Sequence, residues 1–287
     1  MPISVNERLI LEKKAHELRL LCVNTVMWAG GGHIGGALSA MDILTILYYK
    51  YLNIDPKNPN WPDRDRFILS KGHIGVGFAP VLADKGYIDK ELLKKYNHTG
   101  SDLAMHLDSL KVPGADASTG SLGHGLSIAV GTALAARLLK KSHMTYCLLG
   151  DGECNEGSVW EAAMAASHYQ VTNLVTFVDR NKCMIDGPTE EVMGLEPFAK
   201  KWEAFGFIVK AVDGHDFMQL SEAIDFALEE KSAPVVIIAD TNKGCGVDFM
   251  EGDYKWHYGS LDSEKVEQAF ESLEKYYQKR KGVSRNG

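Results

Sequence analysis

The chain has 287 residues, of which 45% are hydrophobic and 24% are charged, so it can bury the core of one large α/β domain spanning residues 1–287. Its net charge of −7 gives no electrostatic case for a nucleic acid or an anionic membrane as partner, and no apolar run approaches the roughly 20 residues of a transmembrane helix. The five cysteines form no C-x-x-C pair, which argues against a disulfide framework or a zinc site and fits a reducing cytoplasm.

The N-terminal half is predicted to contain two helices followed by a long loop region. Residues 6–28 have helical character, and the Ser-x-x-Asp pattern that begins at Ser39 predicts a second helix that extends to Leu52. From there to about Gly125 the sequence is rich in Gly, His and Pro, with only short regular elements such as residues 66–69. This composition is typical of loops that carry function.

The C-terminal half alternates strands with helices. Four short apolar runs rich in β-branched residues are predicted to be strands buried on both faces: residues 146–149, 174–178, 207–212 and 235–239. Helices are predicted at residues 157–168, 197–205, 218–230 and 263 to about 279. The alternation predicts a doubly wound, mostly parallel sheet flanked by helices. We expect the basic run Lys279 to Lys281 to be a solvated tail, within a C-terminal helix and tail at about 263–287.

Two consecutive strand ends carry oxygen ligands, and ligands bind at such ends in doubly wound sheets. One strand runs into the Gly-Asp-Gly of residues 150–152, and the next into the Asp-Arg-Asn of residues 179–181. If the strands are neighbours, the oxygens of Asp151 and Asn181, with a backbone carbonyl, suit Mg²⁺ bound to a diphosphate. The flanking glycines and the start of the next helix favour the same ligand. The alternative is that Gly-Asp-Gly is only a tight turn.

Residues 150–181, GDGECNEGSVWEAAMAASHYQVTNLVTFVDRN, resemble the thiamine diphosphate motif of transketolases. Further segments are similar to transketolase sequences in the same order: AGGGHIGGALSAMDIL, DPKNPNWPDRDRFILSKGH, VPGADASTGSLGHGLSIAVG, NKCMIDGPTEEV and KWHYG. The resemblance covers roughly residues 10–260 and is closer to separately encoded N-terminal subunits than to full-length enzymes. It implies the thiamin diphosphate-binding fold, in the form of its diphosphate-binding domain.

The resemblance also implies a metal site and a cofactor site. Asp151, Asn181 and the backbone carbonyl of Cys183 would hold Mg²⁺, or Ca²⁺ or Mn²⁺ in its place. Thiamine diphosphate would be bound by the residues that match the family's contacts to the cofactor: His73, Gly120, Ser121, Leu122, Gly152, Asn181 and His257.

Four histidines fall in four of these motifs and match the active-site histidines of the family: His33, His73, His106 and His257. The resemblance implies that they surround the thiazolium ring and the sugar hydroxyls. It also implies that three of them, His33, His106 and His257, are catalytic and move protons. Which one is the base in each half-reaction is left open. We expect the histidines at positions 16, 98, 143, 168 and 215 to be structural or solvated.

Two glutamates match carboxylates that link the paired cofactor sites of the family across a subunit interface. They are Glu156 and Glu161, which follow Asp151 in the same motif. Glu156 is therefore a candidate catalytic residue. The alternative is that Glu156 only complements the dipole of the helix that begins there.

The resemblance implies the N-terminal subunit of a two-chain transketolase, which transfers a two-carbon ketol unit from a ketose or ketose phosphate to an aldose or aldose phosphate. No glutamate of the type that activates the aminopyrimidine is identifiable in the sequence. We therefore expect a C-terminal transketolase subunit, with a pyrimidine-binding domain, to complete the site in a two-plus-two assembly. His124 replaces a common Gln and Leu107 replaces a common Pro, and these departures leave the sugar substrates open.

Three alternative functions fit parts of the sequence. The nearest is a subunit of another thiamine diphosphate enzyme, such as a 2-oxo acid dehydrogenase or a deoxyxylulose-phosphate synthase, and the histidines of GGHIGG and KWHYG favour transketolase over these. A non-catalytic subunit is disfavoured by the intact metal ligands and histidines. A nucleotide-binding oxidoreductase is disfavoured because the Gly-rich motif at residues 30–35 follows a helix and lacks an acidic residue for a ribose.

Overall fold

The computed structural model describes residues 3–282, and its framework is one five-stranded sheet. The strand order is β1-β2-β3-β5-β4, and every neighbouring pair is parallel. The strands are β1 (Arg66–Leu69), β2 (Thr145–Gly150), β3 (Leu174–Arg180), β4 (Ile208–Asp213) and β5 (Val235–Asp240). The predicted doubly wound parallel sheet is confirmed, and the strand ends differ from the predicted ones by two residues at most.

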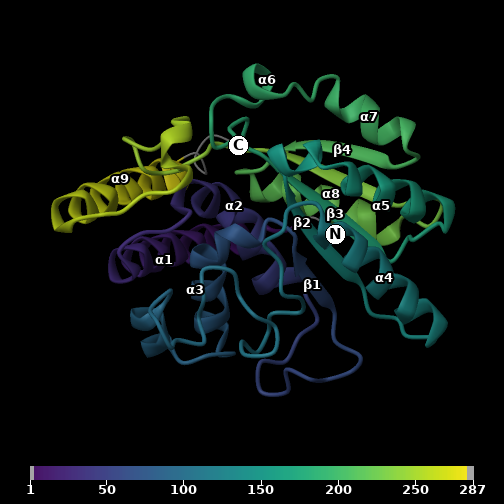
Figure 1. Ribbon diagram of the computed structural model, residues 1–287, viewed down its shortest axis with the longest axis horizontal. Coiled ribbons are helices and arrows are strands. Elements are labelled where there is room, and N and C mark those ends of the chain that lie inside the picture. Colours follow the sequence, from purple (N-terminus) through teal and green to yellow (C-terminus); the bar gives the residue numbers. More distant parts are fainter. Residues whose placement is uncertain (1–2, 283–287) are drawn as a thin grey trace.

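Helices cover both faces of the sheet (Figure 1). One face carries α1 (Val5–Ala29), α2 (Ile34–Ile46), α3 (Gly75–Lys85) and α8 (Phe217–Glu229), with α9 (Ser263–Gly282) packed on α1. The other face carries α4 (His124–Leu138), α5 (Gly157–His168) and α7 (Phe198–Ala204), and α6 (Thr189–Val192) lies in the connection from β3 to β4. Within residues 3–282, no helix has the length and apolar character needed to cross a membrane.

Each central strand contributes side chains to two cores, because successive residues point to opposite faces of a sheet. Along β2, Tyr146 and Leu148 pack with α1, α2, α3 and α8. Cys147 and Leu149 pack with α4, α5 and α7 on the other face. The unbroken apolar run that predicted this strand therefore reflects burial on both sides.

The second helix begins at Ile34, and the prediction that it begins at Ser39 is wrong. Helix α1 ends at Gly30, which has a left-handed φ of 73°, and the chain re-enters a helix directly after His33. Ser39 is therefore buried inside α2, where its hydroxyl donates to the Asp179 carboxylate at 2.6 Å instead of capping a helix. The serine that resembled a helix cap thus forms a contact with β3.

Helix α3 lies in the region where only short regular elements were predicted, and that expectation is wrong for residues 75–85. Pro80 and several glycines gave this stretch the composition of a loop. Gly77 faces α2, and a Cβ placed there would be 2.7 Å from the Cβ of Ala37. The glycine therefore permits close packing of two helices.

The basic run near the C-terminus belongs to α9, where Lys279 and Lys281 are exposed as expected but Arg280 is not. The side chain of Arg280, on α9, is only 11% exposed. It forms ion pairs with Glu12 of α1 and with Asp42 of α2, the latter at 2.9 Å, and it donates to the His215 carbonyl at 2.6 Å. Arg280 thus fastens α9 to the helices that cover the sheet. The predicted tail beyond residue 282 lies outside the described residues.

A buried polar cluster surrounds Asp42. Potential metal-ligand atoms of Asp42, His215 and Cys245 lie within 4.8 Å of one another. The carboxylate already pairs with Arg19 at 2.8 Å and with Arg280 at 2.9 Å, and it accepts from His215 Nδ1 at 2.8 Å. Two guanidinium charges oppose a cation here, so the cluster is a structural ion-pair network.

Candidate active site

A cavity of about 380 Å³ lies at the carboxyl ends of β2 and β3. The two strands are neighbours, with Gly150 opposite Asp179. Residues that follow them therefore meet at one edge of the sheet. Asp151 and Asn181 both line the cavity. The structure thus brings together the two side chains predicted to bind a metal ion, and their role as ligands stays a prediction.

The carboxylate of Asp151 is buried and held by several donors. Its Oδ1 atom accepts from the Gly152 N–H at 2.8 Å. Its Oδ2 atom accepts from the Lys182 N–H at 2.7 Å and from the Arg180 guanidinium at 3.1 Å. Burial raises the pKa of Asp151, the Asp179 carboxylate adds to this effect, and Arg180 opposes it. The orientation of the carboxylate is therefore fixed by the protein.

Asp179 fixes the orientation of Asn181. The Asn181 Nδ2 atom donates to the Asp179 carboxylate and to the Ser39 hydroxyl, each at 3.3 Å. Its Oδ1 atom accepts from the Cys183 N–H at 3.1 Å. Burial raises the pKa of Asp179, but the paired Lys71 ammonium outweighs burial and lowers it. The ionised Asp179 carboxylate binds the amide nitrogen of Asn181. The amide oxygen therefore points toward the loop that contains Cys183, and an amide oxygen is a suitable ligand for a hard cation.

Two buried lysines, Lys71 and Lys243, line the cavity, and the sequence analysis had not singled them out. The Lys243 ammonium lies 3.2 Å from the carbonyl oxygen of Cys183 and 3.3 Å from that of Met184. Burial, and then the charge of Lys71, lower the pKa of Lys243 to about 8. Two ammonium groups in one cavity favour an anionic ligand such as a diphosphate.

Four imidazole rings come together around the same cavity: His33, His73, His106 and His257. They arrive from the chain before α2, the turn before α3, the loop before α4 and the turn at Tyr254–His257. The centroid of the His33 ring lies 5.2 Å from those of His73 and His257, and 6.3 Å from that of His106. The structure thus groups these rings, and their catalytic roles stay predictions.

Burial lowers the pKa of all four imidazoles, so these rings are neutral near neutral pH. Burial, with smaller contributions from His106 and Lys243, lowers the pKa of His33 to about 4. Burial, followed by the charge of Lys243, lowers the pKa of His257 to about 3. The Nδ1 atoms of His33 and His73 are buried and have no hydrogen-bond partner within residues 3–282. Such orphaned atoms fit a site whose missing partner is a bound ligand.

The other predicted cofactor residues lie on loops at this cavity. Gly120, Leu122 and Gly152 line it, whereas Ser121 is exposed and is not among the lining residues. Gly120 has a φ of 151°, and a Cβ placed there would be 2.6 Å from the His106 ring. The glycine therefore lets the loop pack directly against that imidazole.

The two glutamates of the interface motif lie in different surroundings. Glu156 lines the cavity from the residue that precedes α5, and its side chain forms no capping hydrogen bond with that helix. Glu161 is exposed on α5, away from the cavity. The two departures from the family pattern, Leu107 and His124, do not line the cavity either.

A third side chain that the sequence analysis missed is Glu153, whose buried carboxylate joins three loops. It accepts from the Ser70 hydroxyl, from the Gly123 N–H at 2.9 Å and from the Gly150 N–H at 3.0 Å. Like the two lysines, Glu153 lies two or three residues beyond the carboxyl end of a strand. The strand-end rule that located the metal ligands would have found all three of these residues.

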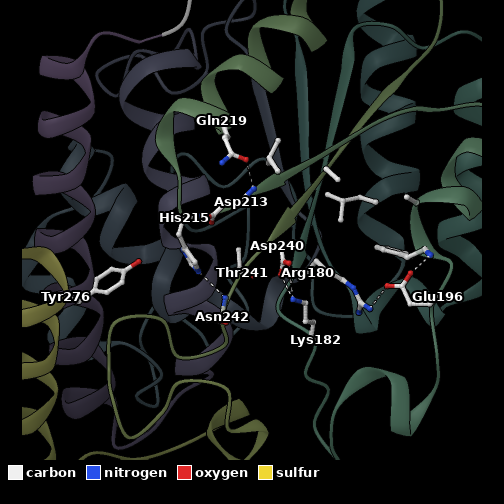
Figure 2. A pocket seen from close by; sticks show the side chains of 15 residues that line it. Arg180, Lys182, Glu196, Asp213, His215, Gln219, Asp240, Thr241, Asn242 and Tyr276 are labelled. Atoms are coloured by element: carbon white, nitrogen blue, oxygen red, sulfur yellow. Dashed lines mark hydrogen bonds and ion pairs between the residues drawn. The ribbon is translucent and has the colours of Figure 1, made fainter. Parts of the chain in front are cut away.

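A wider groove of about 790 Å³ lies beyond the ends of β3, β4 and β5 (Figure 2). Its charged side chains pair with one another, as Lys182 does with Asp240 at 2.6 Å and Arg180 does with Glu196 at 3.0 Å. The smaller cavity holds the orphaned imidazole nitrogens and the strand-end oxygen ligands. We therefore take the smaller cavity as the candidate active site.

Comparison with known sequences agrees with this site. Residues 10–279 match the family model of the thiamine diphosphate-binding domain of transketolase. The chain is 41% identical over 269 residues to the 6-deoxy-6-sulfo-D-fructose transketolase subunit of Clostridium sp., covering 94% of this chain and 98% of that protein. It is also 41% identical over 272 residues to one of the apulose-4-phosphate transketolase subunits of Phocaeicola vulgatus, covering 94% and 95%.

Solved structures of full-length enzymes show the same fold. The transketolase of Campylobacter jejuni matches with a TM-score of 0.88 and 33% identity, and the match covers 95% of this chain and 43% of that enzyme. The transketolase of Leishmania mexicana matches with a TM-score of 0.86 and 27% identity, covering 95% and 45%. The chain thus spans less than half of either enzyme. Its sequence, fold and cavity together show that the chain belongs to the transketolase family, of which it contains the thiamine diphosphate-binding domain.

Proposed function

We propose that this chain is one subunit of a two-chain transketolase, which transfers a two-carbon ketol unit from a ketose or ketose phosphate to an aldose or aldose phosphate. The proposal is supported chiefly by one observation. Four imidazoles and two ammonium groups line the same cavity as the oxygen ligands that follow β2 and β3. The relatives that match over almost their whole length are named as transketolase subunits.

The cavity would hold thiamine diphosphate through its diphosphate and a divalent cation. In this proposal the side-chain oxygens of Asp151 and Asn181 and the carbonyl of Cys183 bind Mg²⁺. Ca²⁺ or Mn²⁺ could replace it, because these cations also accept oxygen ligands. Lys71 and Lys243 supply positive charge to the diphosphate.

The other cofactor contacts come from loops around the cavity. We assign the diphosphate to the backbone at Gly152 and to His73 and His257. The loop with Gly120, Ser121 and Leu122 would flank the aminopyrimidine side of the cofactor.

The histidines would handle the protons of the sugar. Thiamine diphosphate, when bound, supplies the nucleophilic carbon that carries the two-carbon unit. His33 and His257 are neutral at neutral pH because of their lowered pKa values, so each can accept a proton from a sugar hydroxyl. His106 is more exposed and lies 6.3 Å from His33, which suits a group that holds a hydroxyl at the mouth of the cavity.

We infer that a partner chain with a pyrimidine-binding domain covers this cavity, in a two-plus-two assembly. Ile185 lines the cavity and is 62% exposed, which leaves apolar surface for a partner to cover. In this proposal Glu156, at the cavity, and the exposed Glu161 would contact a neighbouring subunit. The chain covers 98% of one subunit-named relative but 43% of the full-length enzyme of Campylobacter jejuni, as a divided enzyme would.

The reaction class can be tested directly. The chain, purified with its partner, is incubated with thiamine diphosphate, Mg²⁺ and pairs of ketose and aldose, and the products are identified by mass spectrometry. We expect one sugar lengthened and the other shortened by a two-carbon unit. Decarboxylation of a 2-oxo acid without any ketol transfer would overturn the proposal in favour of another thiamine diphosphate enzyme.

A further inference from the structure

Arg180, the last residue of β3, lies between the candidate active site and the wider groove. Its side chain is only 7% exposed and meets three carboxylates. One guanidinium nitrogen lies 3.1 Å from Asp151, and another lies 2.9 Å from Glu190 and 3.0 Å from Glu196. Figure 2 shows Arg180 pointing to Glu196 on the groove side. One side chain thus connects the proposed metal ligand to an exposed part of the surface.

The two oxygens of Asp151 are unequally occupied. Oδ2 accepts from Arg180 at 3.1 Å, from the Lys182 N–H at 2.7 Å and from the Thr189 hydroxyl at 3.4 Å. Within the described part of the chain, Oδ1 accepts only from the Gly152 N–H, at 2.8 Å. The lone pairs of Oδ2 are taken by donors, so only Oδ1 has one left for a cation.

We propose that Arg180 is a positioning residue for the metal site: it holds Oδ2 of Asp151 away from the cation, so that Oδ1 alone is presented as a ligand. The inference rests on the proposed function, because it takes Asp151 to bind the metal ion. No other side chain in residues 3–282 forms an ion pair with Asp151. The guanidinium is therefore the one charged donor among the groups that hold Oδ2, beside the Lys182 N–H and the Thr189 hydroxyl.

An arginine suits this place better than a lysine. Its planar group carries several fixed donors, so it can bond Asp151 on one side and two glutamates on the other at the same time. The glutamates are held in turn, since Glu190 accepts from the Leu195 N–H at 3.1 Å and Glu196 accepts from the Phe198 N–H at 2.8 Å. The segment from α6 to α7 therefore anchors the guanidinium that orients the metal ligand.

The sign of the effect on Kd separates positioning from direct repulsion between the guanidinium and the cation. A positive charge near a cation site weakens binding, so removal of Arg180 would tighten binding if charge alone mattered. If Arg180 orients the ligand, its removal weakens binding. Loss of groups that orient a metal ligand typically costs about 10–100-fold in metal affinity.

The test measures Mn²⁺ binding to the full chain, together with its partner, at saturating thiamine diphosphate, with free Mn²⁺ followed by electron paramagnetic resonance. We expect R180M to raise the Mn²⁺ Kd about tenfold or more, and R180K to recover part of the loss. R280M is the matched control, because Arg280 is also buried and also pairs with two carboxylates, neither of which is Asp151. Its Kd should equal that of the wild type.

An unchanged or lower Kd in R180M would overturn the inference. If R180M does not fold, R180K decides, because a lysine cannot reach Asp151 and both glutamates together; a wild-type Kd in R180K would then overturn it. A wild-type assembly that binds no Mn²⁺ with thiamine diphosphate would instead refute the proposed metal site itself, and the inference with it. The two failures are therefore distinguishable.

Discussion

The rings of His33 and His257 lie 5.2 Å apart and nearly perpendicular, at 88°, although they come from opposite ends of the chain. A short antiparallel bridge explains this contact. The Gly32 N–H donates to the Gly259 carbonyl at 2.9 Å, and the Gly259 N–H donates to the Gly32 carbonyl at 3.0 Å. Two backbone hydrogen bonds thus set the relative position of two proposed catalytic groups.

The lowered pKa values of these histidines predict a specific loss of stability in acid. The pKa of His33 is about 4 in the folded chain, against about 6.5 when unfolded, because burial disfavours its charged form. Between these pH values the unfolded state binds more protons, so stability falls as the pH falls through this window. We expect the urea midpoint to drop less between about pH 7 and pH 5 in H33Q than in the wild type.

The matched control for this comparison is H168Q, because His168 is exposed on α5 and lies outside the cavity. Its urea midpoint should follow that of the wild type over the whole range. Equal acid sensitivity in H33Q and the wild type would contradict the account of His33.

Loss of either proposed proton acceptor should reduce turnover, and loss of His33 should spare cofactor binding. H33A and H257A are each expected to lose at least about 10–100-fold in kcat, in line with general acid-base contributions. Thiamine diphosphate affinity, measured by calorimetry on the same preparations, should stay within a few-fold of the wild type for H33A. Wild-type turnover in both variants would mean that the chemistry lies elsewhere.

Removal of the proposed metal ligand should instead abolish cofactor binding. D151A is expected to lose measurable thiamine diphosphate affinity in the presence of Mg²⁺, while its fold is kept because Arg180 retains Glu190 and Glu196. D240A is the matched control, since Asp240 ends strand β5 of the same sheet but is 58% exposed and pairs with Lys182. Calorimetric titration compares them. Undiminished affinity in D151A would exclude Asp151 as a ligand.

Arg280 should matter for stability and not for chemistry. R280M removes one ion pair from Glu12, which keeps Arg8 at 3.5 Å, and one from Asp42, which keeps Arg19 at 2.8 Å. Breaking a buried pair typically costs about 3 kcal/mol or more. The free energy of unfolding from urea titration should fall accordingly. K281M serves as its control, because Lys281 is exposed. Equal stability of R280M and K281M would show that the ion pairs at Arg280 contribute nothing.

The sheet could be predicted from the sequence because each buried strand is a continuous apolar run. The meeting of Asp151 and Asn181 at one cavity could be predicted because each residue directly follows such a run. The prediction failed where the environment of a side chain depends on a partner that is distant in the sequence. Ser39 looked like a helix cap but bonds Asp179 on another element. Lys243 was not singled out and Arg280 was expected to be solvated, yet both are largely buried, because their partners lie far away in the sequence.

The central claim is that the chain contributes one half of a ketol-transferring site, and the most direct test is the activity of the chain with and without its partner. Ketol transfer from a ketose to an aldose is measured with thiamine diphosphate and Mg²⁺, first for the isolated chain, shown by mass spectrometry to be free of partner, and then during titration with the pyrimidine-binding subunit. We expect no turnover above background for the chain alone and full activity at about one-to-one stoichiometry. Robust ketol transfer by the isolated chain would contradict it.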